Sequence, residues 1–175
     1  MHRSSYRIVR KFIRDYVHNT KLEVADLGSQ VIPGQAYSYR ELFTNPDWHY
    51  TGMDISAGNN VDVVLENGYK FPFEDNHFDI IISGQAIEHI EFPWVWFVEM
   101  ARILKHSGIC CVVAPATAHE HRYPIDTYRY YPDGMKALAK WSGLNVIKAE
   151  RLEYTNDPLK KYKTIQDTYL IAKKP

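Results

Sequence analysis

The amino-acid sequence predicts an α/β protein with a doubly wound, mostly parallel sheet. Five short apolar runs end in polar or glycine-rich turns, and these lie at residues 22–27, 49–55, 61–65, 78–83 and 109–114. Segments with helical spacing of apolar residues follow several of these runs, and two more strand-like runs close the chain, at 144–152 and 164–173. Parallel strands buried on both faces have this nearly continuous apolar character, and helices cover their sheet.

The composition indicates one globular domain over residues 1–175. Hydrophobic residues make up 45% of the chain and aromatic residues 14%, which suits a single packed core. Lysine plus arginine and aspartate plus glutamate number 21 each, so no strong overall field attracts nucleic acid or an anionic membrane. No run is long enough for a signal peptide or a membrane span. We therefore expect a cytoplasmic protein with no nucleic-acid or membrane partner.

Apolar residues at helical spacing predict three helices, at residues 5–18, 93–105 and 132–141. The first helix carries an apolar stripe that includes Ile8 and Phe12, and the rest of its surface is basic. A solvated face on a docking helix is the more ordinary interpretation of that surface, with an anion site as the alternative.

The aromatic residues of the second helix are expected to divide between two faces. The helix begins near Pro93, a residue suited to a first helical turn, and its successive positions lie about 100° apart. We expect Trp94 and Phe97 to pack on the sheet and Trp96 to lie on another face. An exposed indole there is a candidate dimer contact.

The only two cysteines, Cys110 and Cys111, lie in one apolar run. Adjacent strand residues point to opposite faces of a sheet, so a disulfide between them is not expected. No metal-type spacing such as CxxC is present. Both are predicted to be buried core residues, as free cysteines commonly are.

Polar residues fall at the ends of three successive predicted strands. Asp26 and Gly28 close the first strand, Asp54 closes the second, and Glu66-Asn67 closes the third. The carboxyl ends of parallel strands share one edge of a sheet, which is where doubly wound folds bind ligands. A carboxylate after the second strand can accept hydrogen bonds from both hydroxyls of a ribose. Together these positions predict a nucleotide-type site, although each acid alone is more often a turn or cap residue.

Four stretches carry a resemblance to the class I S-adenosylmethionine-dependent methyltransferases that act on small molecules, the type 11-like group. They are VADLGS, YTGMDIS, LENGYKFPFEDNHFDIIISGQAIEHI and EMARILKHSGICCVVAP. The resemblance covers about residues 22–115 and implies a Rossmann-like sheet with a terminal antiparallel strand. It divides the chain into an N-terminal helix (1–20), a cofactor-binding core (22–115), an acceptor-side segment (116–134) and a C-terminal helix with a strand pair (135–175).

The resemblance also implies which residues bind S-adenosylmethionine. Asp26, Gly28 and Ser29 belong to the loop at the methionine end of the cofactor, and Asp54, followed by Ile55, holds the ribose hydroxyls. Glu66 or Asn67 lies beside the adenine. The residues after the fourth strand border the reacting sulfonium, namely Ser83, Gly84 and Gln85.

The chain departs from this family in two respects. The usual glycine loop is replaced by Asp26-Leu27-Gly28-Ser29-Gln30, with Pro33 further along. In addition, only about six residues separate the second and third predicted strands, so the usual crossover helix is absent. We therefore expect a trimmed version of the fold, which is compatible with a homodimer.

The segment 119–134 follows the fifth predicted strand and is expected to lie over the carboxyl edge of the sheet. It contains two histidines, two arginines and four tyrosines, and long segments over a site are usually functional. We interpret it as the acceptor side, with Arg122, Tyr128 and Arg129 binding the substrate. The alternative is a packed connector in which the arginines form ion pairs with neighbouring acids.

Transfer of a methyl group to a hydroxyl needs a group that takes the proton, and histidine suits this near neutral pH. His121 and His119 are the candidate catalytic residues, and His89 is a weaker one. His119-Glu120-His121 matches no common metal motif, so no metal is expected.

The predicted function is methyl transfer from S-adenosylmethionine to a small-molecule acceptor, such as a sugar or an anionic metabolite. Strand four ends in Ser83-Gly84-Gln85-Ala86, not in the Asn/Asp-Pro-Pro-Tyr of many enzymes that methylate amines of nucleic acids and proteins. A dinucleotide-dependent oxidoreductase would need GxGxxG after the first strand, which is lacking. The remaining alternative is a degenerate, non-catalytic subunit that binds the cofactor or a partner.

Overall fold

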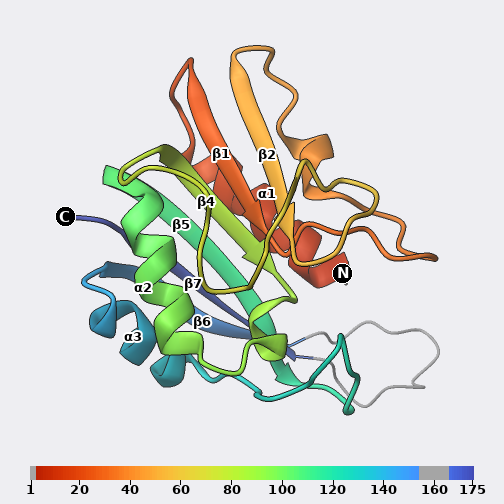
Figure 1. Cartoon of the computed structure of the whole chain (residues 1–175). Coiled ribbons are helices and arrows are strands. Elements are labelled where there is room, and N and C mark those ends of the chain that lie inside the picture. Colours follow the sequence, from red (N-terminus) through yellow and green to blue (C-terminus); the bar gives the residue numbers. More distant parts are fainter. Residues whose placement is uncertain (1–2, 154–165) are drawn as a thin grey trace.

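The structure, a computed structural model, describes residues 3–153 and 166–175. Its strands form one sheet in the order β3-β2-β1-β4-β5-β7-β6 (Figure 1). The predicted strands are confirmed, but the fifth begins five residues before and ends three residues after its predicted run. The bounds are β1 (Leu22–Leu27), β2 (Trp48–Asp54), β3 (Val63–Val64), β4 (Phe78–Gly84), β5 (Leu104–Thr117), β6 (Asn145–Glu153) and β7 (Gln166–Lys173).

The sheet is doubly wound and mostly parallel, as predicted. β1 pairs in parallel with both β2 and β4, and β5 continues the parallel set beside β4. β7 runs antiparallel to its two neighbours, β5 and β6. The chain lays β2 and β3 on one side of β1 and then crosses to lay β4 and β5 on the other. The point where the direction reverses, between β1 and β4, is where such sheets bind ligands.

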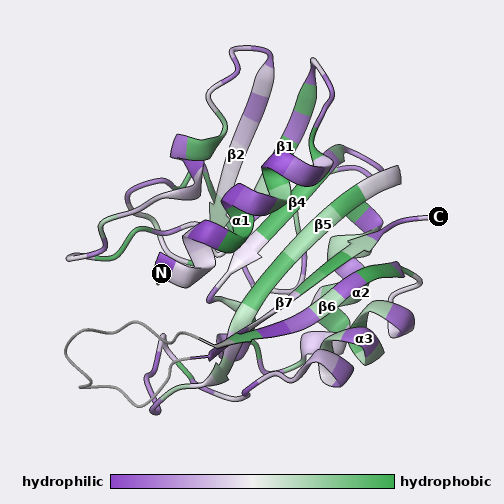
Figure 2. Cartoon of the chain, turned by 180° about the vertical axis from the view of Figure 1, so that it is seen from behind, coloured by the Kyte–Doolittle hydropathy of each residue, from purple (hydrophilic) through white to green (hydrophobic). Residues whose placement is uncertain are grey.

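Helices cover both faces of the sheet. α1 (Arg3–Tyr16) lies in front of the hydrophobic central strands in Figure 2 and turns its hydrophilic surface outward. α2 (Pro93–Ile103) and α3 (Pro132–Trp141) pack on the opposite face. Cys110 and Cys111 are both free and buried, and each belongs to the apolar cluster of a different face. None of the described helices is long and apolar enough to cross a lipid bilayer.

The trimming expected from the sequence is confirmed. Residues 55–77, all of them described, contain β3 and no helix, so β2, β3 and β4 are joined by loops alone. Between β1 and β2 only a short 3₁₀ helix, η1 (Tyr39–Leu42), forms, and Ser38 and Glu41 close a capping box at its start. A second one, η2 (Ile87–His89), follows β4. Residues 154–165, which include the first two residues of the last predicted strand, lie outside the described residues.

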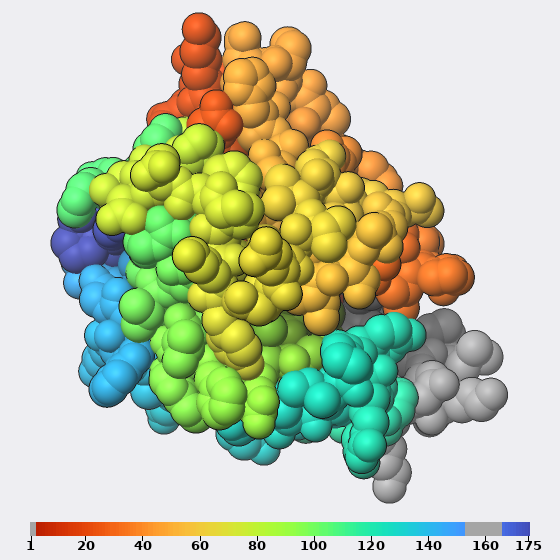
Figure 3. All heavy atoms as spheres, viewed as in Figure 1, coloured from red at the N-terminus to blue at the C-terminus, as the bar shows by residue number. Residues whose placement is uncertain are grey.

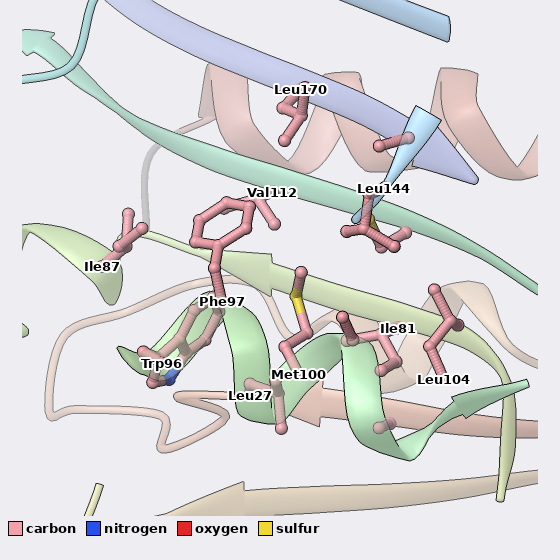
Figure 4. Close-up of a cluster of buried hydrophobic side chains, with 14 of the residues drawn as sticks. Leu27, Ile81, Ile87, Trp96, Phe97, Met100, Leu104, Val112, Leu144 and Leu170 are labelled. Carbon is pink, nitrogen blue, oxygen red and sulfur yellow. The ribbon is translucent and has the colours of Figure 1, made fainter. Parts of the chain in front are cut away.

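The expected orientation of α2 is wrong for its two tryptophans. Trp96 is 3% exposed and Phe97 fully buried, whereas Trp94 is 42% exposed. Figure 4 shows Trp96 beside Phe97 and Met100 among the core side chains. The buried stripe repeats every three or four residues from Pro93, so Trp94 and Val98 fall outside it.

A stripe through Trp94 and the observed stripe through Trp96 would both contain Phe97 and Ala101. Hydrophobicity alone therefore did not distinguish the two orientations of the helix. The helix also ends earlier than predicted, because Leu104 already belongs to β5. An indole contact in a homodimer would therefore use Trp94, and the homodimer itself stays a prediction.

Replacing the two tryptophans separately tests the orientation of α2. We expect Trp96→Ala to lower the free energy of unfolding by about 3–5 kcal/mol, because it removes a buried aromatic side chain and leaves a cavity. Trp94→Ala should change it by less than about 1 kcal/mol. Urea denaturation of both variants measures the difference. Equal losses of stability would contradict this packing.

Candidate functional site

A cavity of about 570 Å³ lies over the carboxyl ends of β1, β2 and β4. In Figure 3 the orange and yellow loops after β2 and β3 lie on one side of this edge, and the teal segment after β5 lies on the other. Small-molecule sites in proteins usually measure about 300–1,000 Å³. The cavity is therefore large enough for a ligand with several functional groups. It is lined by Asp26 and Asp54 at the ends of β1 and β2, and by histidines from the segments after β4 and β5, so the strand order β2-β1-β4-β5 puts the two groups at opposite ends.

Asp26 forms a buried acidic point in the cavity wall. Its side chain is 1% exposed, the Tyr50 hydroxyl donates a hydrogen bond to Oδ2, and Oδ1 has no partner among the described residues. Burial raises the pKa of this carboxyl to about 7, against the lowering effect of the Tyr50 hydrogen bond. The open oxygen can accept a hydrogen bond from a ligand donor, and a cationic donor would favour the charged form.

The loop after β1 lies against the segment after β4. Gly28 has a φ of 80°, in the left-handed region that glycine adopts without strain, and a Cβ at this position would overlap the Cβ of Ala86. The Gly28 and Ser29 amides both donate to the Met53 carbonyl, at 2.9 and 3.0 Å. The close approach therefore requires glycine at position 28.

The departure at Gln30 takes a defined form. Its backbone amide donates to Asp54 Oδ2 at 3.1 Å, and its side-chain amide donates to the Ala57 carbonyl at 3.0 Å. Asp54 Oδ1 accepts from the Ser56 amide at 3.1 Å. Each oxygen of a carboxylate has two acceptor positions, so Asp54 is fixed in orientation and can still accept two hydrogen bonds from a ligand. Gln30 thus links the loops after β1 and β2.

A buried carboxylate and two histidines meet at the other end of the cavity. Glu88 of η2 is fully buried, and its Oε1 lies 3.8 Å from His89 Nε2 and 4.0 Å from His121 Nε2. Burial raises the pKa of Glu88 to about 8 and lowers the pKa of His89. Both histidines line the cavity.

The segment after β5 is held to η2 by specific hydrogen bonds. The amide and the hydroxyl of Thr127 each donate to the Glu88 carbonyl at 2.8 Å. Arg129 binds both carboxylate oxygens of Asp126, at 2.5 and 2.7 Å, and donates to the His119 carbonyl. The Asp126 side chain is 2% exposed, and the guanidinium holds the pKa of its carboxyl well below the usual range.

The structure brings nine of the predicted site residues to the cavity wall. These are Asp26, Gly28, Ser29, Asp54, Ile55, Gly84, Gln85, His121 and Arg122. Arg122 is largely exposed there and pairs with Glu120 at 2.8 Å.

Six others do not reach the cavity wall: Glu66, Asn67, Ser83, His119, Tyr128 and Arg129. Ser83 is buried and donates to the Leu27 carbonyl at 2.7 Å, and the Tyr128 hydroxyl donates to the Glu91 carbonyl at 3.2 Å. Arg129 is bound to Asp126, as the connector interpretation expected. For Tyr128 and Arg129 the observed contacts maintain the segment's shape.

Sequence reasoning missed Glu88 and ranked His89 low. An acid and a histidine between two isoleucines, at residues 87–90 shortly after a buried strand, were the signal that could have found them. It also missed Ile90, which lies with the predicted residue Ile55 within 4 Å of the position that a Cβ on Gly68 would occupy, in the apolar part of the wall.

Comparison with known proteins finds similarity to methyltransferases. Residues 30–112 match a family described as a methyltransferase domain. The ubiquinone/menaquinone biosynthesis C-methyltransferase UbiE of Shewanella frigidimarina is 30% identical over 107 residues, which is 61% of this chain and 41% of the relative. The chain therefore spans about two fifths of that relative's length.

Solved structures share the fold at low sequence identity. A SAM-dependent methyltransferase from Archaeoglobus fulgidus has a TM-score of 0.70 at 18% identity, with 97% of this chain and 95% of that chain covered. Phosphoethanolamine N-methyltransferase 2 of Haemonchus contortus, in complex with phosphomonomethylethanolamine and S-adenosylhomocysteine, has a TM-score of 0.69 at 18% identity. That match covers 97% of this chain and 52% of the other.

The raised pKa of Asp26 predicts a pH-dependent gain in stability for Asp26→Asn. A carboxyl with a pKa near 7 when folded and 3.8 as a model value contributes stability below pH 4, and this contribution is lost as the pH rises through 7. The neutral amide avoids that loss. Relative to the wild type, we expect Asp26→Asn to gain about 2–4 kcal/mol in free energy of unfolding between pH 4 and pH 8.

Denaturant titrations at both pH values measure this gain. Asp133→Asn, on the exposed start of α3, is the control and should follow the wild type. A constant difference between Asp26→Asn and wild type at both pH values would show that Asp26 is charged throughout this range.

Proposed function

We propose that the chain is a class I methyltransferase and transfers a methyl group from S-adenosylmethionine to a small-molecule acceptor. The acceptor we propose carries the reacting oxygen on a sugar or an anionic metabolite. One observation carries the proposal: a single cavity at the switch point has two carboxylates at one end and two histidines at the other.

The residues at the carboxylate end fit the cofactor. Asp54 is held by two backbone amides and keeps acceptor positions for the ribose hydroxyls. Asp26 Oδ1 is buried and lacks a partner among the described residues, so it can accept from the ammonium of the methionine part. Gly28 leaves room for the chain to pass close to Ala86. For the adenine, we propose the apolar wall around Ile55 and Ile90 in place of Glu66 or Asn67, since neither of those reaches the cavity.

The bound cofactor supplies a methyl group that its sulfonium has already activated. The protein therefore has to align the acceptor with this group and exclude water. The acceptor end of the cavity has walls from His89, His121, Arg122 and Tyr123. We propose that His121 controls the proton of the acceptor hydroxyl and that Arg122 binds an anionic or hydroxyl group of the acceptor. His119 is outside the cavity wall and has no role in this proposal.

The named relatives support a small acceptor without identifying it. The Haemonchus enzyme is described with a small phosphorylated base and S-adenosylhomocysteine. The Shewanella enzyme is named a C-methyltransferase of quinone biosynthesis, so a carbon acceptor belongs in the experiment alongside oxygen acceptors.

Binding of S-adenosylhomocysteine tests the cofactor site. Isothermal titration calorimetry should detect binding to the wild type, and Asp54→Ala should weaken it by about 10–100-fold, since hydrogen bonds to a charged acceptor are worth about 1.5–3 kcal/mol. Glu66→Ala is the matched control and should bind like the wild type. If Asp54→Ala binds normally while Glu66→Ala does not, the ribose is held by the end of β3.

Turnover with a labelled methyl group tests the acceptor end. Sugars, nucleotide sugars, carboxylates and a quinol are screened as acceptors. With an active acceptor below saturation, Arg122→Ala should reduce the rate by about 10-fold or more, because a charge-assisted hydrogen bond is lost, while S-adenosylhomocysteine binds unchanged. Arg10→Ala, on the exposed face of α1, is the control.

The same screen decides between oxygen transfer and the other functions. Methylation of an oxygen acceptor supports the proposal. Turnover on the quinol alone would replace oxygen by carbon as the acceptor atom. Binding of S-adenosylhomocysteine with no turnover on any acceptor would instead support the non-catalytic subunit.

A further inference from the structure

Three side chains with metal-ligating atoms converge between η2 and the segment after β5. These are Glu88, His89 and His121, and one ligand atom from each lies within 4.8 Å of the other two. Glu88 and His89 are neighbours in η2, and His121 comes from a segment more than thirty residues later in sequence, so the fold brings the third ligand to the other two. We propose that they form a binding site for a divalent transition-metal ion, of which Zn²⁺ fits best.

The hydrogen bonds of the two histidines direct their free nitrogens at Glu88. His89 Nδ1 lies 2.6 Å from the Ile125 carbonyl, and His121 Nδ1 lies 3.1 Å from the His119 carbonyl. A carbonyl can only accept, so each Nδ1 carries the hydrogen and each Nε2 keeps its lone pair. Both Nε2 atoms face Glu88 Oε1, at 3.8 and 4.0 Å. Metal-binding histidines characteristically donate their second nitrogen to a carbonyl or carboxylate in this way.

Glu88 supplies an independent observation that points to a cation. It is fully buried, and neither carboxylate oxygen has a hydrogen-bond partner among the described residues. The nearby guanidinium of Arg129 does not pair with Glu88, because its two terminal nitrogens donate to Asp126. Buried carboxylates are ordinarily paired, hydrogen-bonded or bound to a metal. A cation between Glu88 and the two Nε2 atoms would provide the missing partner.

The ligand set determines which cation fits. Two imidazoles and one carboxylate are the protein ligands of many catalytic zinc sites, whereas Mg²⁺ and Ca²⁺ prefer oxygen ligands alone. Zinc bonds of about 2.0–2.2 Å require the three ligand atoms to move together by less than about 1 Å. His89 and His121 both line the cavity, so the remaining coordination positions of the metal face it.

This site differs from the metal motif that the sequence analysis rejected. That motif was the local group His119-Glu120-His121, and the present site shares only His121 with it. His119 does not line the cavity, and Glu120 pairs with Arg122. The other two ligands come from η2, which the spacing of residues 119–121 does not reveal.

A catalytic use of the metal rests on the proposed function. Held by Glu88, His89 and His121, the ion would supply a positive charge that lowers the pKa of an acceptor hydroxyl nearby. The hydroxyl would lose its proton to water, its oxygen would form the new bond to the methyl carbon, and the electron pair of the breaking sulfur–carbon bond would stay on sulfur. With the metal bound, His121 would serve as a ligand, and the ion would replace it in promoting loss of the acceptor proton.

Metal binding is measured on the full chain without an affinity tag, at pH 8 and without cofactor. Titration with Zn²⁺ alone should show one ion per chain, and Co²⁺ should give visible absorption bands of a low-symmetry site. Glu88→Gln and His121→Ala should each weaken Zn²⁺ binding by about 100-fold or more, because each removes a ligand and even an outer partner is worth 10–100-fold. His119→Ala is the matched control and should bind like the wild type. Mg²⁺ should not compete.

The change in Tm on adding Zn²⁺ shows whether a variant that folds has lost the metal site. Zn²⁺ should raise the Tm of the wild type and of His119→Ala but not that of Glu88→Gln, whose side chain has the same shape as glutamate. The proposal is overturned if the wild type binds no Zn²⁺, if Glu88→Gln binds it equally well, or if His119→Ala loses it. S-adenosylhomocysteine binding of the same samples is read separately, so a failed metal site and a failed cofactor site are distinguished.

Discussion

The parallel pairing of β1 with both β2 and β4 is the constraint on which the rest of this structure depends. It aligns three carboxyl strand ends, so that Asp26, Asp54 and Gly84 lie along one edge. The chain adds strands on one side of β1 and then on the other, and the cavity lies at the carboxyl ends of the strands where this order reverses. Because the carboxyl end of β4 leads directly into η2, the same pairing carries Glu88 and His89 to the far end of the cavity. Loops without helices are sufficient to join β2, β3 and β4 here.

The main elements of this arrangement could be predicted from the sequence, because apolar runs and the proline and glycine residues that bound them determine these elements locally. The apolar runs ending in Asp26 and Asp54 gave the strand ends to within one residue, and Pro132 with Gly143 gave the bounds of α3. Asp26 and Asp54 line the cavity because strand order alone carries them there. Glu66 could not be placed in the same way, since β3 has two residues and the chain turns directly after it.

What could not be predicted depends on contacts between distant segments. Trp94 and Trp96 fit alternative stripes of α2, and only packing against the sheet selects Trp96. Arg129 was expected to bind the substrate, but its guanidinium forms an ion pair with the buried carboxylate of Asp126. Arg129 therefore does not line the cavity. The meeting of Glu88 with His121 depends on how the segment after β5 folds back through Thr127 onto η2. No spacing in the sequence encodes that return.

The central claim is that the carboxylate end of this cavity holds S-adenosylmethionine and the histidine end holds the acceptor. A crystal structure with S-adenosylhomocysteine tests it most directly. The account predicts ribose hydroxyls within about 3.2 Å of the Asp54 carboxylate, the amino group of the ligand at Asp26, and the sulfur pointing toward the end lined by His89 and His121. A ligand bound outside this cavity, or bound in it with the ribose away from Asp54 and the sulfur away from the histidines, would contradict it.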